Sequence, residues 1–439
     1  MVKKETDLKT ATRVLAAAAA LLVSASLHAQ DKPAAVKIGI TAFLSGPASV
    51  FGEPAKAAAE MMIEQMNKDG GIAGVPLEAT YVDEGAGGEN LLAEYRRLVQ
   101  DEKVDAMLSA ISSGNCNKVA PLAEDLKVLN IMWDCGTQRI FEEGNYRYVF
   151  RTQANATPEM LAAVLYLLKT KPDFKTIAVV NQDYAWGRES WAIFLGALKA
   201  LKPDVKVVAE LFPKFGAPDY STEISRLSAM RPDVILSTSW GGDLDTFVKQ
   251  SAQRGLMKRS TFVLPLAESS LQRLGKDIPE GVIVGGRGDH YFLHPERKGD
   301  AQYMAFVEAF KEKTGAYPIY PVFHMSQALA ALKGAYEKAA AASGDKWPTN
   351  EQVIDAMKGL SFTGLGREVT LREDNQGLED QLMGVTRHVD DYDFAVMDKM
   401  MFFPADKITT PVGKESVEWV KSLKPDFINL ETKNYDHGK

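Results

Sequence analysis

The chain has 439 residues, of which 46% are hydrophobic and 25% charged, and its formal net charge is −7. These proportions are those of an ordinary globular protein, and the length exceeds one average domain, so two units of roughly 150–200 residues are expected. The net charge is modest and no stripe of Lys and Arg occurs, which argues against nucleic acid as a partner.

Residues 1–29 have the pattern of a secretory signal peptide. Four basic side chains lie within 1–13, an apolar run follows over 14–23, and Ala29 ends a stretch of small residues. The run is about half of the ~20 apolar residues that a membrane-spanning helix needs. We therefore expect cleavage after Ala29, with Ala25 as the alternative, and a mature protein in the periplasm with no direct membrane insertion.

Past residue 35, short apolar strands alternate with amphipathic helices. A strand over 36–40 leads to a loop of small residues and a helix that opens near Pro54, since proline suits the first helical turn. Further strands are expected near 104–111, 129–133, 176–180, 205–211, 234–238 and 262–264, with helices near 118–127, 187–201, 218–230 and 241–255. This alternation is typical of βαβ units, in which right-handed crossovers place helices on both faces of a parallel sheet. The fold class predicted is α/β, with two doubly wound parallel-sheet lobes.

The loops at the carboxyl ends of these strands are the expected ligand site. Ligands bind there in open parallel sheets, because helix N-termini offer free N–H groups to an anion such as a carboxylate. The loops of the first lobe carry hydroxyls and amides and those of the second carry aromatics and acids, over 48–52, 112–117, 134–138, 183–187, 239–243 and 265–269. A single Ser or Thr in such a loop is more often a helix N-cap than a ligand group. The prediction depends on their coincidence at successive strand ends.

Several short motifs follow one another in a fixed order along the chain. They are Ile38-Gly39-Ile40-Thr41, Leu44-Ser45-Gly46-Pro47-Ala48, Phe51-Gly52, 67–74, Val82-Asp83-Glu84, 148–152, Asp183 with Trp186-Gly187, and 279–282. This series resembles the leucine/isoleucine/valine-binding protein family, the type I periplasmic binding proteins of ABC transporters, over about 35 to 405. The resemblance implies two lobes joined by a hinge, closure on a small molecule, and delivery to an inner-membrane ABC permease.

The resemblance also implies a lobe division and a set of binding residues. Lobe I takes 30–150 and 286–365, lobe II takes 151–285 and 366–409, and 410–439 forms a polar surface tail. The carboxylate-holding serine and threonine of the family fall on Ser113 and Thr137, beside the backbone of Cys135 and Gly136. The aromatic wall positions fall on Phe51, Trp186 and Trp240, and the ammonium-binding acid on Glu268.

The expected ligand is a small carboxylate, first of all a branched-chain or other apolar amino acid. Phe and Trp where the family often carries tyrosine make the pocket more apolar. Aromatic or aliphatic acids and amides therefore stay open as alternatives to leucine.

The two cysteines, Cys116 and Cys135, form one possible pair in an oxidising compartment. Their loops are expected at the same edge of one sheet, so we predict a disulfide between them.

Other functions are tested by their motifs. No G-x-G-x-x-G follows the first strand, and no Walker A or H-E-x-x-H motif occurs, so we expect neither enzyme activity, catalytic residues nor a cofactor. His290 and His294 are spaced i,i+4, but no third ligand is evident, and no metal site is predicted. A sensor subunit that signals by the same closure remains an alternative to transport. We expect a monomer.

Overall fold

The computed structural model describes residues 32–344 and 346–437. The predicted signal peptide, residues 1–29, lies outside them. Among the described helices none has the length and apolarity that a membrane crossing requires.

The first sheet has five parallel strands in the order β2-β1-β3-β4-β5. The strands are β1 (Val36–Ala42), β2 (Leu77–Asp83), β3 (Ala106–Leu108), β4 (Leu129–Met132) and β5 (Val149–Arg151). The helices between them are α2 (Ser49–Lys68), α3 (Gly88–Gln100), α4 (Ser113–Leu126) and α5 (Arg139–Glu143). Six of the seven residues of β1 are buried, as expected for a central strand covered on both faces.

The second sheet has eight strands in the order β16-β15-β14-β10-β9-β8-β6-β7. Five are parallel, namely β6 (Thr176–Val180), β7 (Lys206–Leu211), β8 (Val234–Leu236), β9 (Thr261–Leu264) and β10 (Ile283–Gly285). The antiparallel strands are β14 (Gln381–Arg387), β15 (Val396–Phe403) and β16 (Lys433–Tyr435). The helices of this part are α6 (Ala156–Thr170), α7 (Ala185–Leu201), α8 (Ser221–Met230), α9 (Gly241–Gln253), α10 (Leu271–Leu274) and α14 (Ala405–Ile408).

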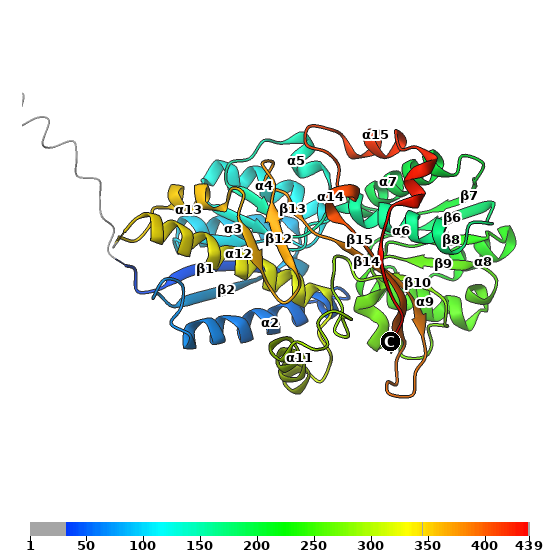
Figure 1. Ribbon diagram of the computed structural model, residues 1–439, viewed down its shortest axis with the longest axis horizontal. Helices are drawn as coiled ribbons and strands as arrows, with labels where there is room; N and C mark the ends of the chain where they lie inside the picture. The colour runs from blue at the N-terminus through cyan, green and yellow to red at the C-terminus, as the bar shows by residue number, and fades with distance from the viewer. Residues whose placement is uncertain (1–31, 345, 438–439) are drawn as a thin grey trace, which may run out of the picture.

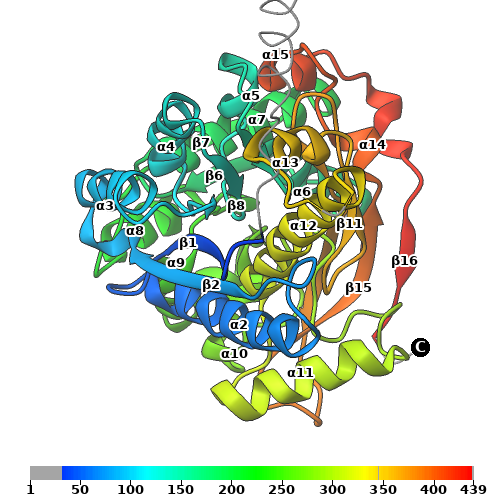
Figure 2. The same ribbon diagram turned by 90° about the vertical axis from the view of Figure 1, so that its left-hand side faces the viewer.

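The rest of the chain adds to both sheets. Helices α11 (Ala301–Thr314), α12 (Tyr320–Ala342) and α13 (Asn350–Met357) lie with the first sheet, next to a small antiparallel sheet of β11 (Ser361–Thr363), β12 (Glu368–Leu371) and β13 (Gly377–Leu378). Short 3-10 turns occupy Glu84–Ala86, Leu256–Lys258, Ala267–Ser270 and Pro425–Asn429. The C-terminal residues form α15 (Ser416–Lys421), packed on α7, and the edge strand β16, which runs along the outside of the molecule in Figure 2.

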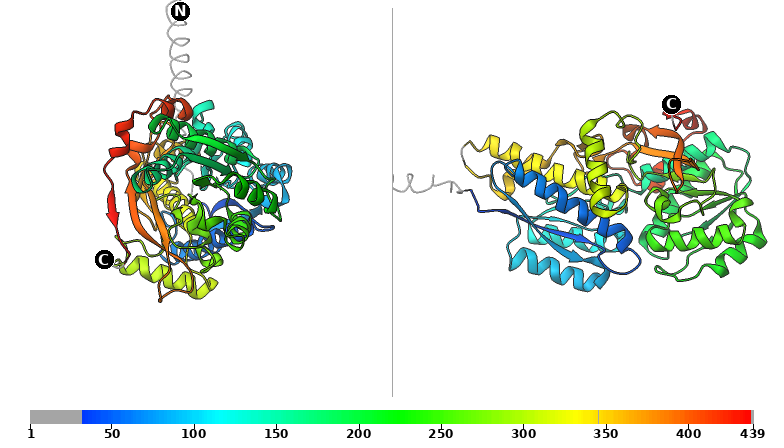
Figure 3. Two further views of the ribbon diagram at one scale, coloured as in Figure 1. Left: turned by 90° about the vertical axis from the view of Figure 1, so that its right-hand side faces the viewer. Right: turned by 90° about the horizontal axis from the view of Figure 1, so that it is seen from below.

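The two sheets form two lobes that lie side by side (Figure 1, Figure 3). The chain passes between the lobes after β5, after β10 and again after β13. The fold is thus the predicted α/β class with two mainly parallel sheets, although the second sheet is mixed. The exact lobe boundaries stay a prediction: within 366–409, β12 and β13 pair with β11 beside α12, whereas β14 and β15 join the second sheet.

Two helices begin earlier than predicted. Helix α2 begins at Ser49, so Pro54 lies inside it rather than in its first turn. Helix α4 begins at Ser113, with Ser112 as N-cap accepting the Asn115 N–H at 3.3 Å. The added turn of α2 contains the buried Phe51, so packing in the cleft outweighs the preference of proline for a helix start.

The predicted disulfide is confirmed. Cys116, in the first turn of α4, is bonded to Cys135 in the loop after β4, and their Cα atoms are 6.1 Å apart. Both loops leave the same edge of the first sheet, as predicted. The bond therefore ties together two of the segments that form the cleft.

Candidate ligand-binding site

A small pocket lies where the loops of the two sheets meet. Every residue that lines it follows the carboxyl end of a strand, and these are two strands of the first sheet and four strands of the second. The lining residues are Ile111 and Ser113 after β3, Asp134 and Gly136 after β4, Tyr184 and Trp186 after β6, Trp240 after β8, Leu266 after β9 and Arg287 after β10. This is the position that parallel sheets favour for ligands.

Aromatic rings form the second-lobe wall of the pocket. The Trp186 indole N–H donates to the carbonyl of Thr238 at 2.8 Å, and the Trp240 indole N–H donates to the Tyr184 hydroxyl at 2.7 Å. Trp240 also packs edge-on against Phe51 of the first lobe, with ring centroids 5.3 Å apart. Because the indole N–H groups already have partners, these rings offer their apolar surfaces to a ligand.

The two lobes touch at the rim of this pocket. The Gly242 N–H at the start of α9 donates to the Pro47 carbonyl at 3.1 Å. A Cβ atom built on Gly136 would lie 2.5 Å from the Trp186 ring and 2.8 Å from Nη2 of Arg287. The structure is therefore that of closed lobes, and glycine at 136 permits the approach.

Arg287 is the buried cation of the site. Its Nη1 donates to Oδ1 of Asp134 at 2.7 Å, and its Nε lies 3.2 Å from Oε1 of Glu159. Its guanidinium also lies over the rings of Trp186 and Tyr320, at 5.3 and 5.5 Å from the centroids. A desolvated cation needs such partners, and here it joins the first lobe to the second.

Burial dominates the electrostatics of this cluster. It raises the pKa of Asp134 to about 7 and that of Glu159 to about 8, although Arg287 lowers both. Burial opposes the charge on Arg287, but Asp134 and Glu159 together raise its pKa. The cluster around Arg287 therefore combines one firm positive charge with two buried acids whose ionisation burial disfavours, and of these two acids Asp134 lines the pocket.

Four of the eight predicted binding residues line the pocket, namely Ser113, Gly136, Trp186 and Trp240. Phe51 stands behind Trp240, buried between it and Tyr320. The Cys135 carbonyl accepts from Arg151 at 3.0 Å, and the Thr137 hydroxyl accepts the Arg139 N–H at 3.2 Å, so both serve the loop itself. Their roles in ligand binding stay predictions.

Glu268 lies under the N-terminus of α12 and is not among the lining residues of the pocket. Its Oε2 accepts the Tyr320 N–H at 2.9 Å. Burial raises its pKa to about 8, although the Tyr320 N–H and Arg273 lower it. In this structure Glu268 thus acts as a buried partner for a helix start.

This environment of Glu268 predicts a pH effect on stability. Because the pKa rises from about 4.3 in an unfolded chain to about 8, the folded state keeps a proton that the unfolded state releases within this window, and the free energy of unfolding falls as pH rises. Glu268→Gln keeps an oxygen for the Tyr320 N–H but cannot ionise. We expect the free energy of unfolding of the variant, relative to that of the wild type, to increase by up to a few kcal/mol between pH 5 and pH 8, as measured by urea unfolding. Parallel pH dependences of the two proteins would contradict this.

The sequence did not single out Asp134, Tyr184, Leu266, Ile111 or Arg287. The first three lie in loops that the pattern marked, and Ile111 ends a predicted strand. Arg287 follows β10, which is only three residues long, and the cue to it is the run Gly285-Gly286-Arg287-Gly288. A charged residue among glycines at a strand end is a signal that could have found it.

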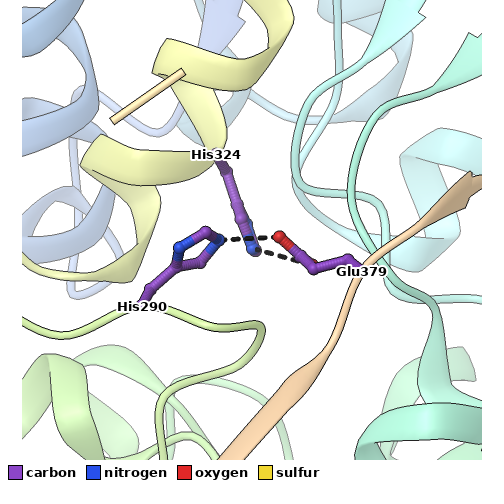
Figure 4. Close-up of side chains that lie close together, drawn as sticks. All are labelled: His290, His324 and Glu379. Atoms are coloured by element: carbon purple, nitrogen blue, oxygen red, sulfur yellow. Dashed lines mark ion pairs between the residues drawn. The ribbon is translucent and has the colours of Figure 1, made fainter. Parts of the chain in front are cut away.

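A histidine cluster lies next to the pocket, between the lobes (Figure 4). The ligating atoms of His290, His324 and Glu379 lie within 4.8 Å of one another, whereas His294 pairs with Asp289 at 2.8 Å. Two imidazoles and a carboxylate could in principle hold zinc.

The contacts of this cluster favour an ion-paired network instead. His290 Nε2 lies 2.8 Å from Oε1 of Glu379, and Nε2 of His324 lies 2.9 Å from the Arg287 carbonyl. Glu379 also accepts the Ala154 N–H at 2.9 Å. Each of the three side chains thus contacts a protein group, although neither ring nitrogen of His290 has a hydrogen-bond partner among the described residues.

A model of the periplasmic binding protein family matches residues 35–391. The chain is 23% identical over 329 residues to the leucine-, isoleucine-, valine-, threonine- and alanine-binding protein of Pseudomonas aeruginosa, covering 74% of this chain and 83% of that one. It is 26% identical over 274 residues to the Leu/Ile/Val/Thr-binding protein of Salmonella typhimurium, covering 62% and 72%.

Solved structures show the same fold. A solute-binding protein of an ABC transporter from Rhodopseudomonas palustris BisB5, in complex with 3,4-dihydroxybenzoic acid, matches with a TM-score of 0.74 at 21% identity, over 87% of this chain and all of that one. A branched-chain amino acid transporter protein from Rhodopseudomonas palustris CGA009 matches with a TM-score of 0.64 at 21% identity, over 87% and 100%. With the family match extending over most of the chain, this protein belongs to the periplasmic binding protein family and is a solute-binding protein rather than an enzyme.

Proposed function

We propose that this protein is the periplasmic solute-binding component of an ABC importer and that it closes on a small carboxylate-bearing ligand. The observation that carries the proposal is the pocket between the lobes, where Ser113 at the start of α4 faces Trp186 and Trp240. A helix N-terminus with a hydroxyl suits a carboxylate, and the indole rings suit an apolar body. The inner-membrane permease is the partner that this function requires.

Two ligand classes are supported by specific observations. A branched-chain or other apolar amino acid is supported by the relatives named above, which bind such amino acids according to their names. An aromatic acid is supported by the indole walls and by the complex of the structural neighbour with 3,4-dihydroxybenzoic acid. We favour the amino acid, and a thermal-shift screen of amino acids, aromatic acids and amides tests this, because a ligand of the folded state raises its stability. A screen in which no carboxylate shifts the melting temperature would refute the proposed ligand class.

Ser113 and its neighbour Ser112 provide a matched pair of variants. Ser113 lines the pocket, whereas Ser112 is the N-cap of α4. We expect Ser113→Ala to weaken ligand binding about ten- to hundredfold, because a ligand oxygen loses a hydrogen bond in a closed cleft. Ser112→Ala should instead lower the free energy of unfolding by about 1 kcal/mol with little loss of affinity. Calorimetry and urea unfolding of both variants measure this, and equal affinities for Ser113→Ala and wild type would remove Ser113 from the site.

A further inference from the structure

The carboxylate of Asp134 has one oxygen with partners and one without. Oδ1 accepts from Nη1 of Arg287 at 2.7 Å and also faces Nδ1 of His324. Oδ2 is buried and has no hydrogen-bond partner among the described residues, and the Asp134 side chain is fully buried. Asp134 also lines the pocket. A buried acceptor without a donor is costly, so something that enters the pocket is expected to satisfy it.

No described side chain around Asp134 donates a hydrogen bond to this oxygen. Nε of Arg287 lies 3.2 Å from Glu159, and Nη2 donates to the Asp134 backbone carbonyl at 3.2 Å. Nε2 of His324 lies 2.9 Å from the Arg287 carbonyl, an oxygen that can only accept. These contacts leave Oδ2 available to a donor that enters the pocket.

Oδ2 is an acceptor in either protonation state of the network. In a neutral His324 the Nε2 proton goes to the Arg287 carbonyl, so Nδ1 is an acceptor and a proton between Nδ1 and Oδ1 belongs to Asp134. If His324 is charged, Nδ1 donates and Asp134 is a carboxylate. Oδ2 keeps its lone pairs in both cases, so the requirement for a donor does not depend on pH.

We propose that the ligand supplies this donor, so that it carries an N–H or O–H group for Oδ2 of Asp134 in addition to its carboxylate. The chemistry is that of an amino acid ammonium or of the hydroxyl of a hydroxy acid. Asp134, from the first lobe, then takes the part that the family resemblance gives to Glu268, whose Oε2 is used by the Tyr320 N–H. This inference rests on the proposed function and narrows its ligand class.

Two pairs of ligands that differ mainly in the donor test the inference by calorimetry. One pair is leucine and 4-methylpentanoate, which lacks the ammonium, and the other is 4-hydroxybenzoate and benzoate, which lacks the hydroxyl. The wild-type protein should bind at least one donor-bearing member roughly ten- to hundredfold more tightly than its partner. The pair that shows the preference identifies the donor as ammonium or hydroxyl.

Variants assign the preference to a residue. Asp134→Asn should abolish it, and Glu268→Gln, a matched change of a buried acid that does not line the pocket, should retain it. A preference that survives Asp134→Asn would overturn the inference. Equal binding of the two members of each pair by the wild-type protein would also overturn it, and this measurement does not depend on whether a variant folds. Equal binding leaves the proposed function intact, whereas binding of none of the four compounds, together with a thermal-shift screen in which no carboxylate raises the melting temperature, overturns that function and this inference with it.

Discussion

Replacement of Gly136 by valine is expected to disfavour closure of the lobes while each lobe still folds. The new Cβ would lie 2.5 Å from the Trp186 ring, which belongs to the other lobe, and 2.8 Å from Nη2 of Arg287. Gly136 does not have a positive φ, so the substitution causes no backbone strain and tests the available space alone. An open arrangement of the lobes relieves the clash, so the cost falls on the closed state.

Such overpacking costs about 1–3 kcal/mol, which corresponds to a loss of ligand affinity of about five- to 150-fold. Gly114→Val is the matched control, because a Cβ at Gly114 has only one neighbour within 4 Å, the Ser112 hydroxyl at 3.8 Å. Calorimetry with the ligand found by thermal shift measures both variants. Wild-type affinity of Gly136→Val would show that the cleft does not need the close approach of Gly136 and Trp186.

Removal of the Arg287 charge is expected to have the largest effect on stability. Arg287→Met leaves Asp134 and Glu159 buried without their cation, and breaking a buried pair in this way costs about 3–5 kcal/mol. Arg97→Met is the matched control, since the pairs of Arg97 with Glu94 and Glu102 are solvent-exposed and such pairs contribute about 0–1 kcal/mol.

The deficit of Arg287→Met is expected to grow with pH. Burial already raises the pKa of Asp134 to about 7 and that of Glu159 to about 8, and loss of Arg287 raises both further. The folded variant then holds protons that the unfolded chain releases, so its free energy of unfolding falls as pH rises. Urea unfolding at pH 5.5 and pH 8 should show a larger difference from wild type at pH 8. A difference below 1 kcal/mol at both pH values would contradict the pairing.

The sequence predicted the parallel parts of the fold well. The strand predicted over 176–180 has the same bounds as β6. A strand that is buried on both faces is a continuous apolar run, so it can be recognised from its own sequence. The sequence did not predict that the second sheet contains antiparallel as well as parallel strands. β16 is three mostly exposed residues in a polar tail, and its pairing with β15 is set by tertiary contact rather than by its own pattern.

The candidate site shows the same division. Ser113, Gly136, Trp186 and Trp240 stand next to strand ends, so position in the chain alone brings them to the pocket. Arg287 meets Asp134 across 153 residues of sequence, and Glu268 meets the Tyr320 N–H across 52, so no local pattern reports either contact. The acid that lines the pocket therefore could not be distinguished from Glu268 without the packing of the two lobes.

The central claim is that the lobes close around a small carboxylate. In the described structure two contacts between the lobes accompany the closed state. The Gly242 N–H donates to the Pro47 carbonyl, and the Trp240 ring packs against the Phe51 ring. Small-angle X-ray scattering of the protein, titrated with the ligand that thermal shift identifies, measures closure directly. The account predicts a radius of gyration that decreases in proportion to occupancy for the wild type, and that decreases only at about five- to 150-fold higher ligand concentration for Gly136→Val. A radius that is unchanged in the wild type at saturating ligand would contradict it.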